Sequence, residues 1–370
     1  MSVLIYGATG FTGRLVANAL SRRGIPFVLS GRDRHRLDAM ASDFDEPVET
    51  RAAQVHNAAN MAAAVEGNAV VINCAGPFDK LGEPVVRAAI DAGAHYIDTT
   101  GEQAFMRRVY ESYESAARRA KVAVVNGCAF EIALGDWAAA LAAAAFDGGD
   151  GDGTCDELFV AYAMDKFKAT SGTQLSAIDS LAQDGVVWSV DRWESVRPAA
   201  ERRVVQFPEP FGERSTLSFP SGEVISVPRH TRSQRVQTFI SMFGESTRDS
   251  LLSRATGVLG PALPFLLRSP LLTAMKARVG QSGAGPTPVQ RRDSTFAIVA
   301  EAERSLERRR VCVAGCDPYG ITAEVIAYAA NHLLVSERSA VGVLAPSQLI
   351  DASVGLTEIA EVCLLEVTRN

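Results

Sequence analysis

A glycine-rich turn near the amino terminus constrains the fold of this chain more than any other feature. Residues 6–13 read YGATGFTG, directly after the apolar run 3–6 and before an amphipathic stretch over 14–20. In a turn between a strand and a helix, such glycines allow a tight bend, close approach of a diphosphate and close helix packing, and the helix amino terminus attracts phosphate. This context predicts a dinucleotide site more strongly than a structural turn. The predicted cofactor contacts are Gly7, Thr9, Gly10, Phe11, Thr12 and Gly13.

Short apolar runs alternate with amphipathic stretches over the first 125 residues. The runs lie at 3–6, 27–29, 69–72, 95–97 and 122–125, and helical patterns lie between them at 14–20, 37–40, 61–65, 85–90 and 105–117. Pro84 is expected in the first turn of the fourth of these helices. Continuous apolar runs separated by helices are typical of parallel strands that are buried on both faces. The sequence therefore predicts the α/β class, with a Rossmann doubly wound parallel sheet over residues 1–127.

The pattern changes after Gly127. An alanine-rich helix over 136–145 leads into a turn cluster at 147–153. Longer strands are predicted at 157–162, 204–207, 224–227, 295–301 and 310–313, with helices near 173–181 and 322–334. This mixture predicts a second α+β domain over 128–336 with a mostly antiparallel sheet. The length of 370 residues also favours two domains.

Cofactor choice is predicted from the end of the second strand, where Ser30, Gly31 and Arg32 stand. An NAD enzyme usually presents a carboxylate here, whereas an NADP enzyme presents small and basic residues to the 2′-phosphate. Arg32 can pair bidentately with a phosphate and Ser30 can donate a hydrogen bond. Asp33, one position later, argues for NAD, and a solvated arginine at a helix start is the alternative interpretation of Arg32. The pattern as a whole favours NADP.

Small residues also follow the fourth predicted strand, where they would let the backbone reach the nicotinamide side of the crevice. A structural turn is the competing interpretation for each of them. Asp98 and Thr100 follow the fifth strand, either as residues at the ligand edge of the sheet or as caps of the next helix. The predicted nicotinamide-side residues are Cys74, Ala75, Gly76, Pro77 and Phe78.

Composition excludes several classes of protein. Thirty-seven Lys and Arg against 43 Asp and Glu give a net charge of −6, which excludes a chain built to coat nucleic acid. Six cysteines without a CxxC pair, together with five histidines, predict neither a metal site nor a disulfide framework, as expected of a cytoplasmic protein. No secretory leader or transmembrane segment is predicted. The segment 251–276 predicts core or dimer packing, with an interfacial helix or lid as the alternative.

Five motifs in order resemble the saccharopine dehydrogenase-like oxidoreductases, including the trans-acting enoyl reductases. They are GATGFTG at 7–13, SGR at 30–32, CAGPF at 74–78, GEPVV at 82–86 and HYIDTTGE at 95–102, with weaker islands at 171–176, 285–291, 315–323 and 342–346. The resemblance implies an NADP-binding first domain, a second domain that supplies a substrate cleft and a homodimer surface, and a segment of about 337–370 packed back on the first domain.

The chain departs from the family pattern at residues 127–136. GCAFEIALGD stands where the family often has a GFDSxPSD run facing the substrate. Glu131 either substitutes as a polar group or is a carboxylate at a helix entry.

The resemblance implies an NADPH-dependent oxidoreductase that reduces a polarised double bond, enoyl C=C or imine C=N, of a small or lipid-like acyl substrate. Tyr96, Lys166 and Ser171 are predicted to polarise that substrate. One alternative is a catalytically silent NADP-binding protein, membrane-peripheral or a scaffold. Another is a carbonyl reductase of the short-chain dehydrogenase kind, because Tyr162 and Lys166 fit Tyr-x-x-x-Lys. The run 157–162, however, predicts a strand where that dyad uses a helix.

Overall fold

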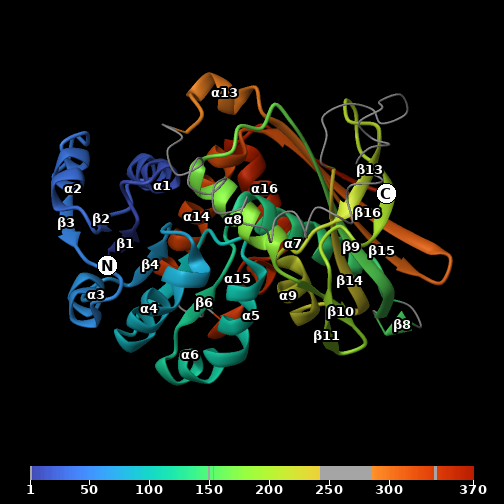
Figure 1. Ribbon diagram of the computed structural model, residues 1–370, viewed down its shortest axis with the longest axis horizontal. Coiled ribbons are helices and arrows are strands. Elements are labelled where there is room, and N and C mark those ends of the chain that lie inside the picture. Colours follow the sequence, from blue (N-terminus) through green and yellow to red (C-terminus); the bar gives the residue numbers. More distant parts are fainter. Residues whose placement is uncertain (1, 149–150, 153, 242–284, 337–339) are drawn as a thin grey trace. The chain divides into compact units, whose positions relative to one another are not determined.

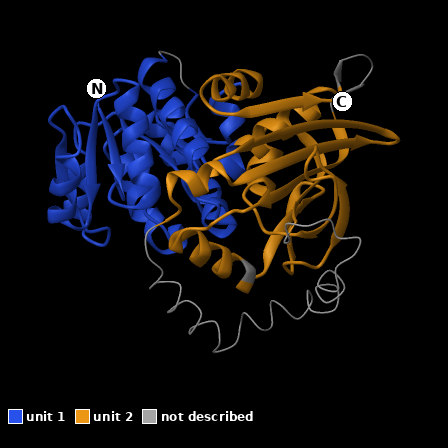
Figure 2. Cartoon of the chain, turned by 90° about the horizontal axis from the view of Figure 1, so that it is seen from above, with its two compact units in different colours: residues 1–133, 319–351 blue, residues 134–318, 352–370 orange. Residues whose placement is uncertain are grey.

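A computed structural model describes residues 2–148, 151–152, 154–241, 285–336 and 340–370. The chain divides into two compact units, which Figure 2 distinguishes by colour. Unit 1 comprises residues 1–133 and 319–351, and unit 2 comprises residues 134–318 and 352–370. The segment 251–276, with its predicted packing or interfacial helix, lies outside the described residues.

Unit 1 is built on a parallel sheet (Figure 1). Over its described residues the sheet has seven strands in the order β17-β6-β5-β4-β1-β2-β3. The strands are β1 (Val3–Tyr6), β2 (Phe27–Gly31), β3 (Glu49–Ala52), β4 (Val70–Asn73), β5 (His95–Asp98), β6 (Ala123–Val125) and β17 (Gly342–Leu344). Every neighbouring pair is parallel. The predicted Rossmann sheet is confirmed, and the strand order reverses direction between β1 and β4.

Helices cover both faces of this sheet, because right-handed crossovers place α1 and α2 on one face and α3 to α6 on the other. The helices are α1 (Phe11–Arg22), α2 (Arg34–Ala41), α3 (Ala58–Val65), α4 (Phe78–Asp91), α5 (Gln103–Ser112), α6 (Glu114–Ala120), α14 (Pro318–Val335) and α15 (Pro346–Leu349). The ring of Tyr319 in α14 lies 5.1 Å from that of Phe11, and Glu324 pairs with Arg22 and Arg23 at 2.6 and 2.8 Å. These contacts hold α14 against α1.

Two helix predictions in unit 1 were wrong in detail. Pro84 was expected in a first turn, but α4 begins at Phe78 and Pro84 lies inside it. The helix extends further because the Glu102 carboxylate accepts the otherwise unpaired N–H groups of Phe78 and Asp79 at 2.9 and 2.7 Å. The predicted helix 105–117 is divided at Tyr113 into α5 and α6.

Unit 2 contains a mixed sheet (Figure 1). Among the described residues its order is β11-β10-β14-β9-β15-β16-β18, with β13 joined to β14 and β12 joined to β13. The strands are β9 (Thr154–Asp165), β10 (Gly185–Ser189), β11 (Arg192–Val196), β12 (Arg202–Gln206), β13 (Glu213–Ser218), β14 (Arg232–Ile240), β15 (Thr295–Arg304), β16 (Glu307–Cys316) and β18 (Leu365–Arg369). Only β9 and β14 pair in parallel among these strands. The prediction of an α+β part with a mostly antiparallel sheet is confirmed.

The remaining elements are α7 (Phe130–Ala144), β7 (Asp147–Gly148), β8 (Gly151–Asp152), α8 (Ser171–Ala182), α9 (Glu223–Ser226), η1 (Val227–Arg229), α13 (Pro288–Arg292) and α16 (Ala352–Val362). The strand predicted at 224–227 is wrong, because this apolar run forms α9 and the start of η1. The Ile225 and Ser226 N–H groups both donate to the Gly222 carbonyl, at 2.8 and 3.1 Å. A short buried apolar run fits either structure, so periodicity could not distinguish them.

The observed division differs from the expected one at its two ends. The sequence placed 128–336 in the second domain and 337–370 with the first. In the structure α14 and β17 belong to unit 1, whereas α16 and β18 belong to unit 2. The physical reason is strand pairing: β17 extends the parallel sheet beside β6, and β18 extends the mixed sheet beside β16.

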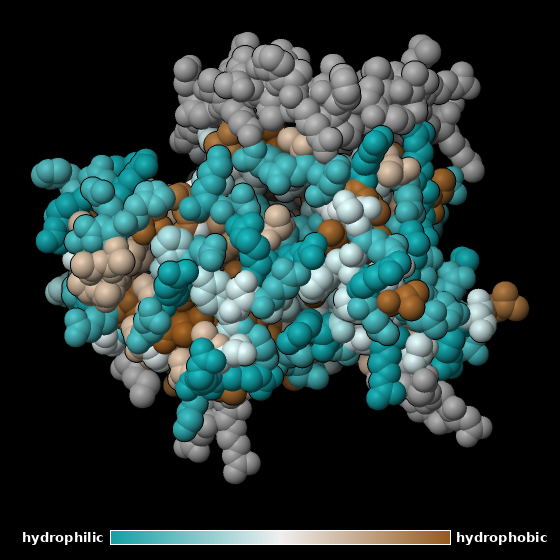
Figure 3. Space-filling model, turned by 60° about the horizontal axis from the view of Figure 1, so that its bottom comes forward, coloured by the Kyte–Doolittle hydropathy of each residue, from teal (hydrophilic) through white to brown (hydrophobic). Residues whose placement is uncertain are grey.

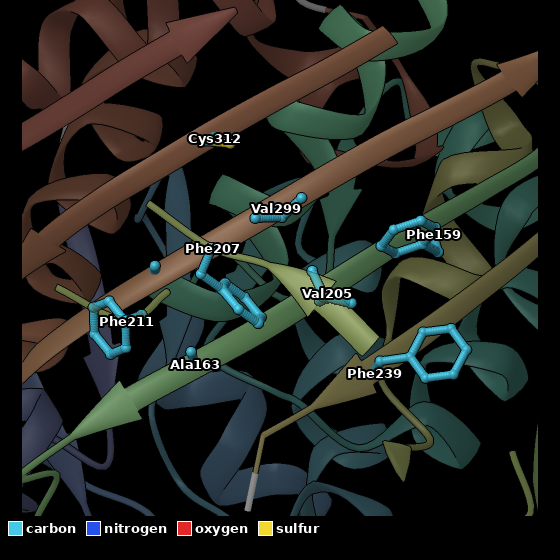
Figure 4. Packing of buried hydrophobic residues seen from close by; sticks show 10 residues of the cluster. Phe159, Ala163, Val205, Phe207, Phe211, Phe239, Val299 and Cys312 are labelled. Carbon is cyan, nitrogen blue, oxygen red and sulfur yellow. The ribbon is translucent and has the colours of Figure 1, made fainter. Parts of the chain in front are cut away.

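One face of the unit 2 sheet is covered by residues from β12 and the turn that follows it. Figure 4 shows Val205 and Phe207 over Phe159 and Val299, within a buried cluster that also holds Phe239. The Arg203 guanidinium lies 4.3 Å from the centre of the Phe159 ring, a cation–π distance. On the molecular face in Figure 3, hydrophilic residues cover most of the described surface and apolar groups are small and separate. The cluster around Phe159 and Phe207, in contrast, is buried.

Gly135 in α7 is predicted to be essential to the packing of unit 2. A Cβ at this position would lie 2.7 Å from Glu223 Oε1 and closer still to the Tyr162 hydroxyl. We expect Gly135→Ala to lower the free energy of unfolding by about 1–3 kcal/mol, because the added methyl overpacks a buried polar contact. Urea unfolding monitored by tryptophan fluorescence tests this, since Trp137, Trp188 and Trp193 all lie in unit 2.

Gly172→Ala in α8 is the matched control for this substitution. A Cβ there meets nothing closer than Thr170 Oγ1 at 3.8 Å. The change should be neutral or stabilise unit 2 by up to about 1 kcal/mol, because alanine is the better helix former. Equal losses in the two variants would contradict the packing argument.

Candidate nucleotide-binding site

The glycine-rich loop joins β1 to α1 and is fixed to the end of β2. The N–H groups of Gly7 and Ala8 both donate to the Ser30 carbonyl, at 2.9 and 3.1 Å. Gly7 has a φ of +82°, and a Cβ on it would lie 2.9 Å from the Ala75 nitrogen. Only glycine meets both requirements without strain, so the loop packs directly on the segment after β4.

The amino end of α1 is open to an anion. Its N-cap, Gly10, supplies no side-chain hydrogen bond, and the first turn contains no acidic residue. Over the described residues, no hydrogen bond is recorded for the backbone N–H groups of Phe11, Thr12 and Gly13. A Cβ on Gly13 would lie 2.8 Å from Ala8 Cα, so the cradle requires a glycine there. Unpaired donors at a helix amino terminus fit a diphosphate.

The polar residues at the end of β2 differ in exposure and in hydrogen bonding. Arg32 is exposed, and within the described part of the chain its guanidinium makes no hydrogen bond or ion pair. Asp33 is the N-cap of α2 and accepts the Arg36 N–H at 3.1 Å, so the carboxylate that argued for NAD has a structural role. Ser30 is buried beside Gly31 and donates to the Arg51 carbonyl at 2.8 Å. Arg32 is therefore the side chain available to a phosphate at this strand end.

The segment after β4 is shaped by two side chains. Asn73 Oδ1 accepts the Ala75 N–H at 3.0 Å, and Glu102 accepts the N–H groups of Phe78 and Asp79. Burial, together with the nearby Asp98, raises the pKa of Cys74 to about 12, so this cysteine stays a thiol at neutral pH. The predicted nicotinamide-side residues differ in exposure. Gly76 is exposed, Phe78 is buried, and the other three are half-buried: Cys74, Ala75 and Pro77.

Asp98 is the centre of a buried network at the carboxyl ends of β4, β5 and β6. Its Oδ1 accepts the N–H groups of Thr100 and Gly127 at 3.1 and 2.9 Å. Its Oδ2 accepts the Tyr96 hydroxyl at 2.9 Å and the Asn126 amide at 2.7 Å. Burial raises the pKa of Asp98 to about 6, although these four hydrogen bonds act in the opposite direction. Neither Asp98 nor Thr100 is the N-cap of α5, a position that Glu102 occupies.

The three residues predicted to polarise a substrate lie in different surroundings. Tyr96 belongs to unit 1 and is fully buried, with its hydroxyl donating to Asp98 and accepting from Asn73 Nδ2 at 3.1 Å. Burial raises its pKa well above the usual value. Lys166 and Ser171 belong to unit 2, Lys166 exposed just after β9 and Ser171 half-buried as the first residue of α8. The Tyr96 hydroxyl thus serves the hydrogen-bond network of unit 1.

The Tyr-x-x-x-Lys match lies on a strand, as its sequence predicted. Tyr162 is inside β9 and its hydroxyl donates to the buried Glu223 carboxylate, while Lys166 follows the end of the strand. The helical spacing that would place the two side chains together is missing, so the structure removes the dyad on which the carbonyl reductase alternative rested.

Sequence reasoning missed the roles of Asn126 and Glu102. Asn126 follows β6 and donates to Asp98, while its Oδ1 is buried with no partner recorded within the described chain. Both residues are polar and follow a buried apolar strand, which is the signal that could have singled them out. Glu131, in the first turn of α7, lies near Gly101, and burial raises its pKa.

The described part of the chain contains neither a metal-binding group of side chains nor a membrane-spanning helix. No group of three His, Cys, Asp or Glu side chains is arranged to hold a metal ion. None of the helices there is long and apolar enough to cross a membrane.

Comparison with known proteins identifies relatives of the N-terminal domain. Residues 3–148 match the family described as saccharopine dehydrogenase NADP binding domain. A Mycobacterium tuberculosis protein with the provisional name trans-acting enoyl reductase is 33% identical over 134 residues, 35% of this chain and 32% of its own. A lipid droplet localized protein of Caenorhabditis elegans is 32% identical over 144 residues, 35% of this chain and 33% of its own. A saccharopine dehydrogenase-like oxidoreductase of Bos taurus is 28% identical over 146 residues, 35% and 34% of the two chains.

The matched segment spans about a third of the length of these relatives. A solved structure covers the rest of the chain: saccharopine dehydrogenase (L-Glu forming) from Saccharomyces cerevisiae has a TM-score of 0.63 over 100% of this chain and 99% of its own. Its sequence identity is 12%, so this likeness concerns the fold. The predicted resemblance to the saccharopine dehydrogenase-like proteins is confirmed.

Proposed function

Because residues 3–148 match the family described as saccharopine dehydrogenase NADP binding domain, we propose that the protein is an NADPH-dependent oxidoreductase. The observation that carries this proposal is the open amino end of α1 beside the exposed Arg32 guanidinium. One feature binds a diphosphate and the other distinguishes a 2′-phosphate from a hydroxyl. Together they match the two charged parts of NADPH.

The residues of the chain have distinct tasks in this proposal. The N–H groups of Phe11, Thr12 and Gly13 hold the diphosphate, and Thr9 and Gly10 lead the chain into that turn. Arg32 pairs with the 2′-phosphate next to Gly31, while the buried Ser30 fixes the end of β2 through its bond to Arg51. The backbone of residues 74–78 lines the nicotinamide side, since it follows β4 at the carboxyl edge of the sheet.

Bound NADPH would supply a hydride to a polarised double bond, enoyl C=C or imine C=N. The name of one relative, a trans-acting enoyl reductase, supports the enoyl class, and the name of the lipid droplet protein is in keeping with a lipid-like acyl substrate. For polarising the substrate we retain Lys166 and Ser171 of unit 2, and we do not retain Tyr96, because its hydroxyl is fully buried. A homodimer and a cytoplasmic location remain predictions.

Arg32→Ala is expected to weaken NADPH binding by about 1–3 kcal/mol, because a charge-assisted pair with the 2′-phosphate is lost. Binding of NADH should stay almost unchanged, since NADH has no such phosphate. Titration of each nucleotide, followed by its own fluorescence, measures both affinities. Equal losses for NADPH and NADH would refute the role of Arg32.

Arg34→Ala is the matched control, because it removes the same charge two residues away. The Arg34 guanidinium already donates to the Thr50 carbonyl at 3.1 Å and to the Thr50 hydroxyl at 3.3 Å. We therefore expect NADPH affinity in this variant to fall less than in Arg32→Ala. A larger loss in Arg34→Ala would move the phosphate site to that residue.

A catalytically silent NADP-binding protein is the second candidate, favoured by the apolar character of the 127–136 segment. Cys128, Ala129 and Phe130 are buried there, as are the apolar residues 132–134. Oxidation of NADPH in the presence of enoyl, imine and keto substrates separates the candidates. Tight NADPH binding without turnover of any of these classes would favour the silent protein, and failure to bind either nucleotide would exclude both.

A further inference from the structure

The sheet of unit 1 divides the nucleotide site into two halves. Its strand order changes direction between β1 and β4. In a doubly wound sheet each half carries one mononucleotide, and the dinucleotide crosses the switch point between them. The glycine-rich loop and Arg32 belong to the half made by β1, β2 and β3. The other mononucleotide, which contains the nicotinamide, therefore depends on the segments that follow β4, β5 and β6.

A single buried carboxyl group joins these three segments. Asp98 ends β5 and stands opposite Asn73, which ends β4, in the parallel register. Through the Tyr96 hydroxyl it reaches the Asn73 amide, and Asn73 in turn fixes the Ala75 N–H. It also accepts the N–H groups of Thr100, after β5, and Gly127, after β6. The Asp98 carbonyl receives the Cys128 N–H at 2.8 Å, which adds a second link to the segment after β6.

We propose that Asp98 is a positioning residue for the nicotinamide half of the cofactor, holding segments 73–78, 99–102 and 126–128 in one arrangement. This inference rests on the proposed NADPH-dependent function. Asp98 itself is fully buried and does not touch the ligand. It acts through the backbone of the three segments.

The network places two hydrogen-bond-accepting oxygens at this position. Four donors converge on the two oxygens of Asp98. An asparagine would offer one oxygen, and its own NH₂ group would face the donors that now meet the other oxygen. In a buried site, unpaired donors are costly, so the segments would move until their N–H groups find other partners.

The test compares two ligands that occupy different parts of the site. Adenosine 2′,5′-bisphosphate contacts only the half with Arg32, whereas NADPH spans both halves. We expect Asp98→Asn to weaken NADPH about tenfold, the effect of one lost buried hydrogen bond to a charged group, and to leave the bisphosphate within about twofold. Calorimetric titration of both ligands on the full chain measures this ratio. Arg32→Ala is the control, because it should weaken both ligands and not NADPH alone.

Tyr96→Phe is a second variant for the case in which Asp98→Asn does not fold. It keeps the core volume and removes only the hydroxyl that links Asp98 to Asn73. NADPH should weaken about fivefold, with the bisphosphate again unchanged. Equal weakening of both ligands, or no weakening of NADPH, would overturn the role of Asp98. Failure of the unaltered protein to bind either ligand would instead reject the proposed function.

Discussion

Replacing Gly13 by alanine is expected to lower the free energy of unfolding of unit 1 by at least about 3 kcal/mol, at the upper end of overpacking effects. The new Cβ would lie 2.8 Å from both Ala8 Cα and the Ala8 carbonyl oxygen, and closer still to the Gly7 carbonyl oxygen. These are backbone atoms of residues 7 and 8, whose N–H groups donate to the Ser30 carbonyl. The loop therefore cannot move away from the new methyl group without breaking these hydrogen bonds. NADPH binding should be lost as well, because the loop must open.

Hydrogen exchange measured by mass spectrometry is the appropriate observable for Gly13→Ala. The tryptophans of the chain lie in unit 2, so their fluorescence does not report on this loop. We expect lost protection in peptides covering residues 3–31. Gly31→Ala is the control, because a Cβ there meets nothing closer than Leu37 Cδ2 at 3.9 Å. Native protection in Gly13→Ala, or the same loss in both variants, would contradict the close approach.

Asp98 should make the stability of unit 1 depend on pH. Burial raises its pKa from 3.8 to about 6 in the folded chain. The folded state therefore binds the proton more tightly than the unfolded state, and stability falls as the pH rises through this range. With 1.36 kcal/mol for each unit, the full effect is about 3 kcal/mol, and the unaltered protein should gain about 2 kcal/mol of it relative to Asp98→Asn between pH 7 and pH 4.

Urea unfolding at pH 4, 5, 6 and 7, followed by far-ultraviolet circular dichroism, measures this difference. The hydrogen bonds lost in Asp98→Asn lower its free energy of unfolding at every pH. The effect of the proton is therefore the pH dependence of the difference in free energy of unfolding between the two proteins. All other titrating groups are common to the two proteins and cancel. A difference that is flat, or that shrinks on acidification, would show that the Asp98 carboxyl is ionised at the usual pH in the folded chain.

Much of the fold could be predicted because its signals are local. Residues 3–6 and 70–72 are apolar without interruption, since strands buried on both faces have no solvent side. The role of the glycines at 7, 10 and 13 was predictable for the same reason, because the geometry of a single turn requires a residue without a side chain at each position. The run at 224–227 was not, because a short buried apolar segment has the same composition as a strand or as a helical turn.

The sequence predicted which segments form the candidate site but not the hydrogen bonds between their side chains. Arg32 and the loop at 74–78 follow strands at the ligand edge, which sequence order alone indicates. The sequence did not show that Asp33 caps α2. It also suggested Tyr96 as a group for the substrate, whereas the hydroxyl lies between Asn73 and Asp98. Asn73 and Tyr96 are 23 positions apart, and no local pattern reveals the bond between them.

The sequence by itself determined the strand, turn and helix that cradle a diphosphate, the preference for NADP, and the succession of a parallel and a mostly antiparallel sheet. Each of these follows from short-range sterics, charge or periodicity. The tertiary structure alone decided which polar residues are exposed and which are held by hydrogen bonds inside the fold. Burial was the deciding factor, because a polar group removed from water must find its partner inside the protein. For Asp98 those partners are Tyr96, Thr100, Asn126 and Gly127.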